Sequence, residues 1–230
     1  MDFVEGEVLL FDKGLTWTSF DIVNKLRYLI KKQLNIKNIK VGHAGTLDPL
    51  ATGLLIVCTG KKTKMIDTYQ AQTKEYAATL KIGATTPSFD RESEEDSSYP
   101  TDHITKELIQ KVLAQFIGEQ DQVPPIFSAK KIDGKKAYEI ARKGKEIELK
   151  PNRIVIYELE LVSYQPPLLG IRVVCGKGTY IRSLARDIGV ALNSGAYLHD
   201  LRRTKIGEYL VENAYEILEF EKIIKNLQPT

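Results

Sequence analysis

The sequence predicts an α+β fold built on a largely antiparallel, mixed sheet that is flanked by helices and loops. Two observations predict it. Strand-like segments come in neighbouring pairs, and segments with the helical spacing of apolar residues stand between these pairs. The 230 residues are 43% apolar and 27% charged, which is typical of a globular protein with a real core.

The first half of the chain is predicted to begin with a strand at residues 7–11. A helix start follows at residues 18–21. Apolar residues then repeat at helical spacing, at Val23, Leu26, Leu29 and Ile30. Residues 54–58 and 74–83 are the next predicted strands, and the second of these alternates in part between apolar and polar side chains.

The second half is predicted to hold further helices at residues 105–116, 137–143, 179–192 and about 214–227. The second of these follows a hairpin-type turn, Ile132-Asp133-Gly134, and ends at Gly144. Two strands, 154–164 and 169–175, are parted by two prolines and form a meander-like pair.

The composition excludes several classes of protein. No apolar run approaches the length of a membrane span, and the N-terminus has early acids and lacks the basic region of a secretory signal. Cys58 and Cys175 lie in apolar runs, so we expect buried free thiols, and the scattered histidines and cysteines give no metal-ligand cluster. We therefore expect a cytoplasmic protein without a bound metal.

The net charge of +3 is mild, but the charges are unevenly distributed. Residues 128–153 hold nine basic and four acidic side chains, which suits a phosphate backbone but is also typical of a solvated, lysine-rich face. Residues 89–107 hold seven acidic and two basic side chains and are expected to form an exposed loop.

Residues 42–54, GHAGTLDPLATGL, are the most informative segment. A single carboxylate, Asp48, lies between glycines, and Pro49 fixes the chain directly after it. We expect this loop to hold Asp48 in one place. The residues alone leave open whether the carboxylate serves catalysis or only turn hydrogen bonds.

This segment resembles the catalytic loop of the TruB family, the stand-alone tRNA pseudouridine-55 synthases. Further segments resemble the family in the same order: Asp12-Lys13 to Thr18-Ser19, Lys74-Glu75-Tyr76, Pro124 to Gly144, Cys175 to Leu184, and Leu201-Arg-Arg-Thr204. The resemblance implies the pseudouridine synthase catalytic fold over residues 1–207, with an RNA-gripping segment at 124–150. Residues 208–230 would be a remnant of the PUA-type RNA-binding domain that the family usually carries.

The resemblance also implies a reaction and three catalytic residues. Pseudouridine formation breaks the glycosidic N–C bond, rotates the uracil and rejoins it through carbon, so no cofactor or metal is required. Asp48 would be the nucleophile, and Arg182 would hold it ionised and aimed. Tyr76 would stack on the base that leaves the RNA stack. Without the resemblance, Tyr76 is more simply a core aromatic. For Arg182, a surface position at a helix start remains an alternative, although its place after Gly-Lys-Gly-Thr argues against it.

Six further residues are implied to contact the RNA or line the base pocket: Lys13, His43, Lys64, Lys130, Tyr180 and Leu201. Tyr180 and Leu201 would line the pocket, His43 would fill the place of the flipped base, and the lysines would meet phosphate. Three alternatives remain: ordinary core packing for Tyr180 and Leu201, a hydrogen-bonding surface role for His43, and solvation for the lysines.

As a whole, the resemblance implies a monomeric enzyme that isomerises the uridine at position 55 in the T-loop of tRNA, recognises the T-arm and needs no protein partner. Two alternatives remain. A non-catalytic RNA-binding or remodelling protein would need neither Asp48 nor Arg182. A catalytic subunit of a guide-RNA particle is a related enzyme, and the Pro124–Gly144 segment argues against it.

Overall fold

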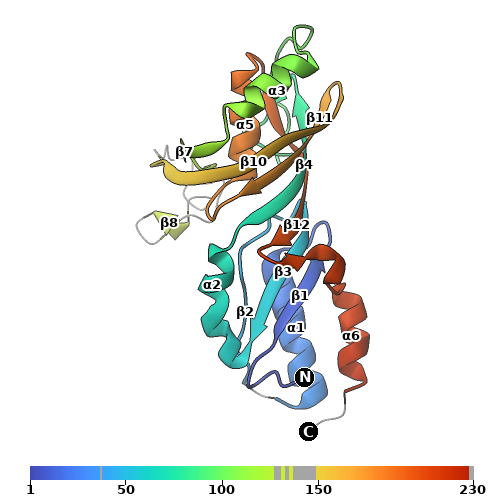
Figure 1. The fold of residues 1–230 in the computed structure, drawn as a ribbon. Coiled ribbons are helices and arrows are strands. Elements are labelled where there is room, and N and C mark those ends of the chain that lie inside the picture. The colour runs from blue at the N-terminus through green and yellow to red at the C-terminus, as the bar shows by residue number, and fades with distance from the viewer. Residues whose placement is uncertain (37, 127–130, 133–134, 137–148, 228–230) are drawn as a thin grey trace. The chain divides into compact units, whose positions relative to one another are not determined.

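The computed structural model describes residues 1–36, 38–126, 131–132, 135–136 and 149–227 (Figure 1). The chain divides into two compact units. The terminal unit comprises Met1–Tyr76 and Leu201–Thr230, and the central unit comprises Ala77–Asp200. None of the helices in the described ranges is long and apolar enough to cross a membrane.

The terminal unit is organised around β3 (Ala51–Thr59). β1 (Val8–Lys13) runs antiparallel along one edge of β3. On the other edge, β2 (Val41–His43) pairs antiparallel with the end of β3, and β12 (Ala196–Ile206) pairs parallel with its start. β13 (Tyr209–Leu210) pairs with the end of β12.

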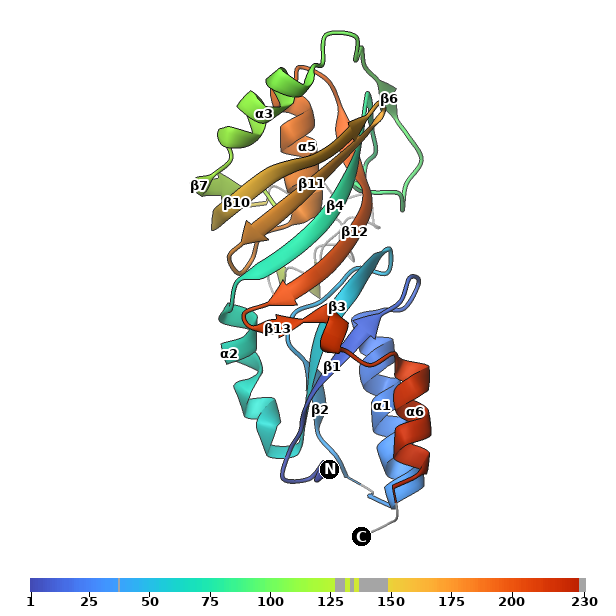
Figure 2. The ribbon, with the colours of Figure 1, turned by 45° about the vertical axis from the view of Figure 1, so that its right-hand side comes forward.

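Helices cover the strands of the terminal unit because the apolar side chains of β3 alternate between its two faces. Leu55 and Val57 pack in one cluster with α1 (Ser19–Leu34) and α6 (Ile217–Lys225), which lie side by side (Figure 2). Leu54, Ile56 and Cys58 pack on the other face, where Tyr69 of α2 (Ile66–Ala71) joins them. Two 3₁₀ turns, η1 (Gly60–Met65) and η2 (Val211–Asn213), complete the unit.

The central unit contains a sheet with the strand order β12-β4-β11-β10-β7. Its strands are the first residues of β12, the larger part of β4 (Lys74–Ile82), β7 (Gly118–Gln122), β10 (Asn152–Gln165) and β11 (Leu168–Cys175). β10 pairs antiparallel with both β11 and β7. α3 (Lys106–Ala114) contacts β10 and α5 (Ile181–Ala191). Two short pairs, β5 (Ala84–Thr85) with β6 (Ser97–Ser98) and β8 (Lys131–Ile132) with β9 (Lys135–Lys136), are separate from this sheet.

The predicted fold class is confirmed, since the sheet is mixed and largely antiparallel and helices flank it. As expected, Cys58 and Cys175 are both buried, and no disulfide joins them. The prediction missed β2, β7, α2 and, above all, β12. The predicted helix at 137–143 and the turn residues Asp133 and Gly134 lie outside the described residues, although β8 and β9 pair on either side of that turn.

Candidate active site

The Asp48 loop connects β2 to β3 in the terminal unit. The Asp48 carbonyl oxygen accepts a hydrogen bond from the Ala51 amide at 3.0 Å, and the side chain is partly exposed. Gly45 and Gly53 have φ angles of 96° and 102°, in the left-handed region that favours glycine. A Cβ on Gly53 would lie 2.3 Å from the Arg203 carbonyl oxygen. The expected need for glycine on both sides of Asp48 is therefore met.

The N-terminal segment braces this loop on both sides of Asp48. The buried Ser19 hydroxyl accepts a hydrogen bond from the Leu47 amide at 2.8 Å and donates to the Leu47 carbonyl at 3.2 Å. The Thr16 amide donates to the Pro49 carbonyl at 2.9 Å. Thr16 has a φ of 70°, which is unfavourable for a β-branched residue, so this loop conformation is stabilised by its surroundings.

Lys13, at the end of β1, lies inside the unit. Its side chain is fully buried, and Nζ donates to the carbonyl oxygens of Gly14 at 3.0 Å and Trp17 at 2.7 Å. Burial lowers the pKa of Lys13 to about 8; the Asp48 carboxylate opposes this change, and the Arg203 guanidinium adds to it. The ammonium group therefore supports the main chain of residues 14–17, the segment that is hydrogen-bonded to Pro49 next to Asp48. The RNA contact expected of Lys13 stays a prediction.

Arg203 is a buried cation that the sequence analysis did not single out. Its side chain is enclosed beside the Asp48 loop, where Nε donates to the Leu54 carbonyl at 2.7 Å and Nη2 to the Gly45 carbonyl at 3.1 Å. A signal for it exists in the sequence. If residues 201–204 form a strand, two consecutive arginines must point to opposite faces, and one of them then points inward.

His43 ends β2 and is half-buried. Burial lowers its pKa, the Arg203 guanidinium lowers it further, and the neighbouring Gly45 main chain partly offsets both. Its Nδ1 atom is buried and has no hydrogen-bond partner among the described residues. The imidazole is therefore neutral at physiological pH, and a contact with RNA would depend on its shape and polarity rather than on a positive charge.

Three other residues of the predicted site belong to the terminal unit. Leu201 pairs with Ala51, so it lies beside the end of the Asp48 loop. Tyr76 is buried in β4, and Lys64 is exposed in η1. The unit thus brings Lys13, His43 and Leu201 to the Asp48 loop. Lys130 lies outside the described residues.

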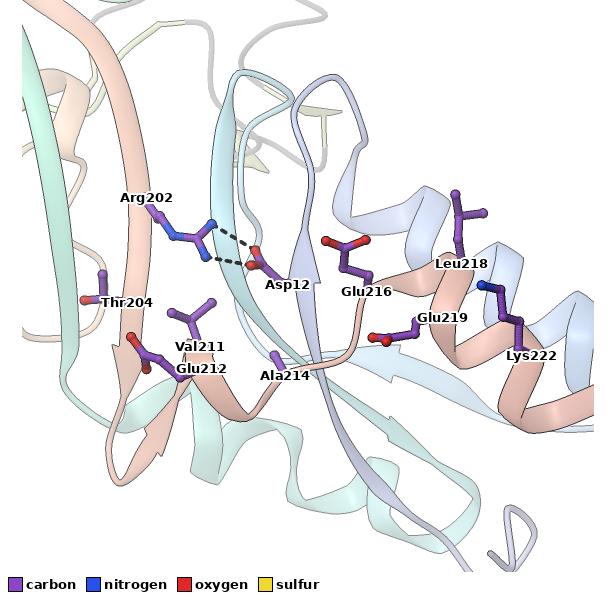
Figure 3. A pocket seen from close by; sticks show the side chains of 10 residues that line it. All are labelled: Asp12, Arg202, Thr204, Val211, Glu212, Ala214, Glu216, Leu218, Glu219 and Lys222. Carbon is purple, nitrogen blue, oxygen red and sulfur yellow. Dashed lines mark hydrogen bonds and ion pairs between the residues drawn. The ribbon is translucent and has the colours of Figure 1, made fainter.

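A pocket of about 590 Å³ lies in the same unit, lined by residues of β1, β12, η2 and α6 (Figure 3). Arg202 forms a two-pronged ion pair with Asp12 there, with Nη–Oδ distances of 3.0 and 2.6 Å. The other charged groups of the pocket are Glu212, Glu216, Glu219 and Lys222. Because carboxylates outnumber cations, this pocket repels phosphate and is a poor place for RNA.

Arg182 lies in the first turn of α5 in the central unit, where it is buried. Its Nη1 atom lies 3.4 Å from Asp90 Oδ2 and donates to the Ser88 carbonyl at 3.3 Å. Asp90 Oδ1 accepts from the Ser88 hydroxyl at 2.6 Å and from the Glu92 amide at 2.9 Å. The buried carboxylate therefore orients the guanidinium and balances its charge.

Asp90 corrects one expectation. The acidic stretch 89–107 was expected to form an exposed loop, and Arg91 to Tyr99 are indeed largely exposed. Asp90 itself is 5% exposed because it is the counter-ion of Arg182. Nothing in the local sequence separates this aspartate from its exposed neighbours.

Tyr180 directly precedes α5 and is half-buried. The side chain of Gln122, buried at the end of β7, accepts from the Tyr180 amide at 2.8 Å and donates to the Tyr180 carbonyl at 3.1 Å. This reciprocal pair fixes the main chain at Tyr180, two residues before Arg182. Gln122 was not foreseen. Among the described residues, no group of three or more His, Cys, Asp or Glu side chains could hold a metal ion.

Comparisons with known proteins agree with one another. The family model described as TruB family pseudouridylate synthase (N terminal domain) matches residues 31–181. A protein of Parabacteroides distasonis named tRNA pseudouridine synthase B is 63% identical over 92% of this chain and 90% of its own length. A protein of Bacteroides fragilis with the same name is 57% identical over 97% of this chain and 96% of its own length.

A solved structure described as a Cbf5-Nop10-Gar1 complex contains a chain with the same fold. The TM-score is 0.71 and the sequence identity is 28%. The match covers 96% of this chain but 54% of the solved chain, so this protein spans about half the length of that one.

Proposed function

This chain belongs to the TruB family of pseudouridylate synthases, and we propose that it isomerises a uridine of tRNA, at position 55 in the T-loop, to pseudouridine. The family match and the high identity to the relatives confirm the family resemblance inferred from the sequence. The observation that carries the proposal is the Asp48 loop: one carboxylate, with both of its chain neighbours hydrogen-bonded to the N-terminal segment, in a chain of this family.

Asp48 is the proposed nucleophile. The reaction breaks the bond between the ribose carbon and the uracil nitrogen and forms one between the same ribose carbon and a ring carbon. A proton leaves that ring carbon and the freed nitrogen gains one, so no oxidant or reductant takes part. The carboxylate must be ionised and held in place to attack, either at the ribose or at the ring. The buried Lys13 cation, whose pKa reflects the Asp48 charge, favours the ionised form.

Arg182 is proposed as the second charged group of the reaction. Its orientation is supported by Asp90, which lies buried beside it and is itself held by Ser88 and Glu92. The pairing of Arg182 with Asp48 that the family resemblance implies stays a prediction.

Base recognition is proposed for the aromatic and apolar residues. The target uridine leaves its stack at a cost of a few kcal/mol, and stacking on Tyr76 would offset part of that cost. Tyr180 and Leu201 would line the base pocket. His43, neutral because of burial and Arg203, would occupy the space that the base leaves. Lys64, exposed in η1, can approach phosphate.

The experiment is pseudouridine formation by the purified chain alone on an unmodified tRNA transcript, detected by carbodiimide labelling. We expect one modified uridine, and none when position 55 is cytidine. Asp48→Asn should abolish turnover and leave RNA affinity nearly intact, whereas the exposed Asp67→Asn should match the wild type. Tight binding by an inactive wild type would favour the RNA-remodelling alternative, and activity only after addition of a guide RNA would favour the particle subunit.

A further inference from the structure

Arg203 connects the two ends of the Asp48 loop. Gly45 precedes Asp48 in the chain and Leu54 follows it, and their carbonyl oxygens accept from Nη2 at 3.1 Å and from Nε at 2.7 Å of one guanidinium. We propose that Arg203 is a positioning residue, which clamps both flanks of the loop so that Asp48 keeps its place. This inference rests on the proposed function, since it assumes that Asp48 is the nucleophile.

The main chain of Arg203 contributes to the same clamp. It pairs with Gly53 in the parallel contact of β12 with β3, which also joins Leu201 to Ala51. The approach is close, because a Cβ on Gly53 would lie 2.7 Å from the Arg203 amide nitrogen and 2.3 Å from its carbonyl oxygen. One flank is thus held by main chain and side chain together, and the other flank by the side chain alone.

The chemistry of the site calls for arginine. Nε and Nη2 are fixed in one planar group, so they can serve two acceptors on different segments at once, whereas the single nitrogen of lysine cannot reproduce this fork. A buried cation is also costly, and an apolar residue of similar size would often be neutral or stabilising in its place. A clamp on the nucleophile loop gives a reason for this charge that stability alone does not.

The charge of Arg203 supports the same inference. Arg203 lowers the pKa of both Lys13 and His43, so its positive charge acts on the two titratable groups that lie beside the loop. The Asp48 carboxylate in turn raises the pKa of Lys13. The clamp is therefore also a fixed cation that acts on both Lys13 and His43.

Arg202 offers a matched control. It is the neighbouring arginine of the same strand, but it pairs with Asp12 on the acidic pocket and is 42% exposed (Figure 3). Arg203→Lys and Arg202→Lys make the same chemical change on opposite faces of β12.

The test compares single-turnover rate constants, RNA dissociation constants and amide hydrogen exchange of residues 44–54. For Arg203→Lys we expect a rate loss of about 10- to 100-fold, since a small misplacement of a reacting group is costly. The RNA dissociation constant should change less than about twofold because the side chain is buried, and exchange in the loop should accelerate. Arg202→Lys should resemble the wild type in all three.

A second variant, Arg203→Met, keeps the side chain long and removes both hydrogen bonds, and it replaces Arg203→Lys if the latter does not fold. A rate within about threefold of the wild type, or unchanged exchange in the loop, in the folded Arg203 variant would overturn the inference. If the wild type makes no pseudouridine, the proposed function fails, and hydrogen exchange still decides whether Arg203 clamps the loop.

Discussion

The buried pair of Arg182 and Asp90 gives a prediction whose size follows from the geometry. In Asp90→Asn, the amide oxygen can keep the hydrogen bonds from Ser88 and Glu92 that Oδ1 accepts. The amide nitrogen then replaces Oδ2, 3.4 Å from Arg182 Nη1, so that two donors face each other. The side chains of Arg182 and Asp90 are only 6% and 7% exposed, so little water can compensate the charge.

Removing one partner of a buried ion pair costs about 3–5 kcal/mol. The separation of 3.4 Å and the remaining hydrogen bond to the Ser88 carbonyl place this pair at the lower end, at about 3 kcal/mol. For a chain of this size the melting temperature should fall by roughly 6–12 °C. Turnover should also fall, because the guanidinium of Arg182 loses its orientation.

The assay is urea unfolding followed by circular dichroism, with Asp200→Asn as the control. Asp200 pairs with Arg91 at 2.8 Å in the same unit, but these side chains are 55% and 35% exposed. An exposed pair contributes about 1 kcal/mol or less. If the free energy of unfolding falls by the same small amount in both variants, burial does not make the charge of Asp90 more important for stability than that of Asp200.

Three further predictions concern the Asp48 loop and the lysines that we expect to bind RNA. Burial lowers the pKa of Lys13 from 10.5 to about 8, so between these two pH values the unfolded chain binds the proton of Lys13 more readily than the folded chain does. The free energy of unfolding of the wild type, relative to that of Lys13→Met, should therefore rise from pH 8 to pH 10.5 in urea titrations. A fall over this range would contradict the prediction. Ser19→Ala should lower the free energy of unfolding by about 1–3 kcal/mol, because the Leu47 amide and carbonyl lose their buried partner, and an unchanged urea midpoint would exclude the brace. The last variant neutralises Lys130, Lys131, Lys135 and Lys136 together. It should bind tRNA more weakly, and the slope of log affinity against log salt concentration should become shallower by about one unit for each phosphate contact that is lost. A slope equal to that of the wild type would show that these four lysines are only a solvated face.

Local features were readable in the sequence where neighbouring residues decide the structure. Thr18 and Asp21 form a capping box at the start of α1, within three residues of each other. Gly45 and Gly53 have the positive φ angles that the loop around Asp48 requires. Most of the strands and helices follow from the spacing of apolar side chains, because that spacing decides which face of an element can be buried.

The strand β12 was missed because its sequence does not resemble a buried strand. Residues 201–204 contain two arginines, and the alternation of apolar side chains is interrupted there. The strand exists because residues 201–203 pair in parallel with β3, which lies far away in the chain. No local preference encodes such a pairing, so a window of the sequence could not reveal it.

Arg203 and Asp90 show the same limit at the site. The carbonyl oxygens that Arg203 bridges lie 149 and 158 residues from it in the sequence. Asp90 and Arg182 are also far apart in the sequence and pair only in the folded chain. In the sequence, Arg203 stands next to other basic residues and Asp90 stands near other acidic residues, so neither differs visibly from its neighbours. The sequence by itself determined the family, the Asp48 loop and most secondary structure, since these depend on motifs and short-range spacing. Only the tertiary structure decided which charges are buried and what they hold, because burial and pairing depend on segments that meet only when the chain folds.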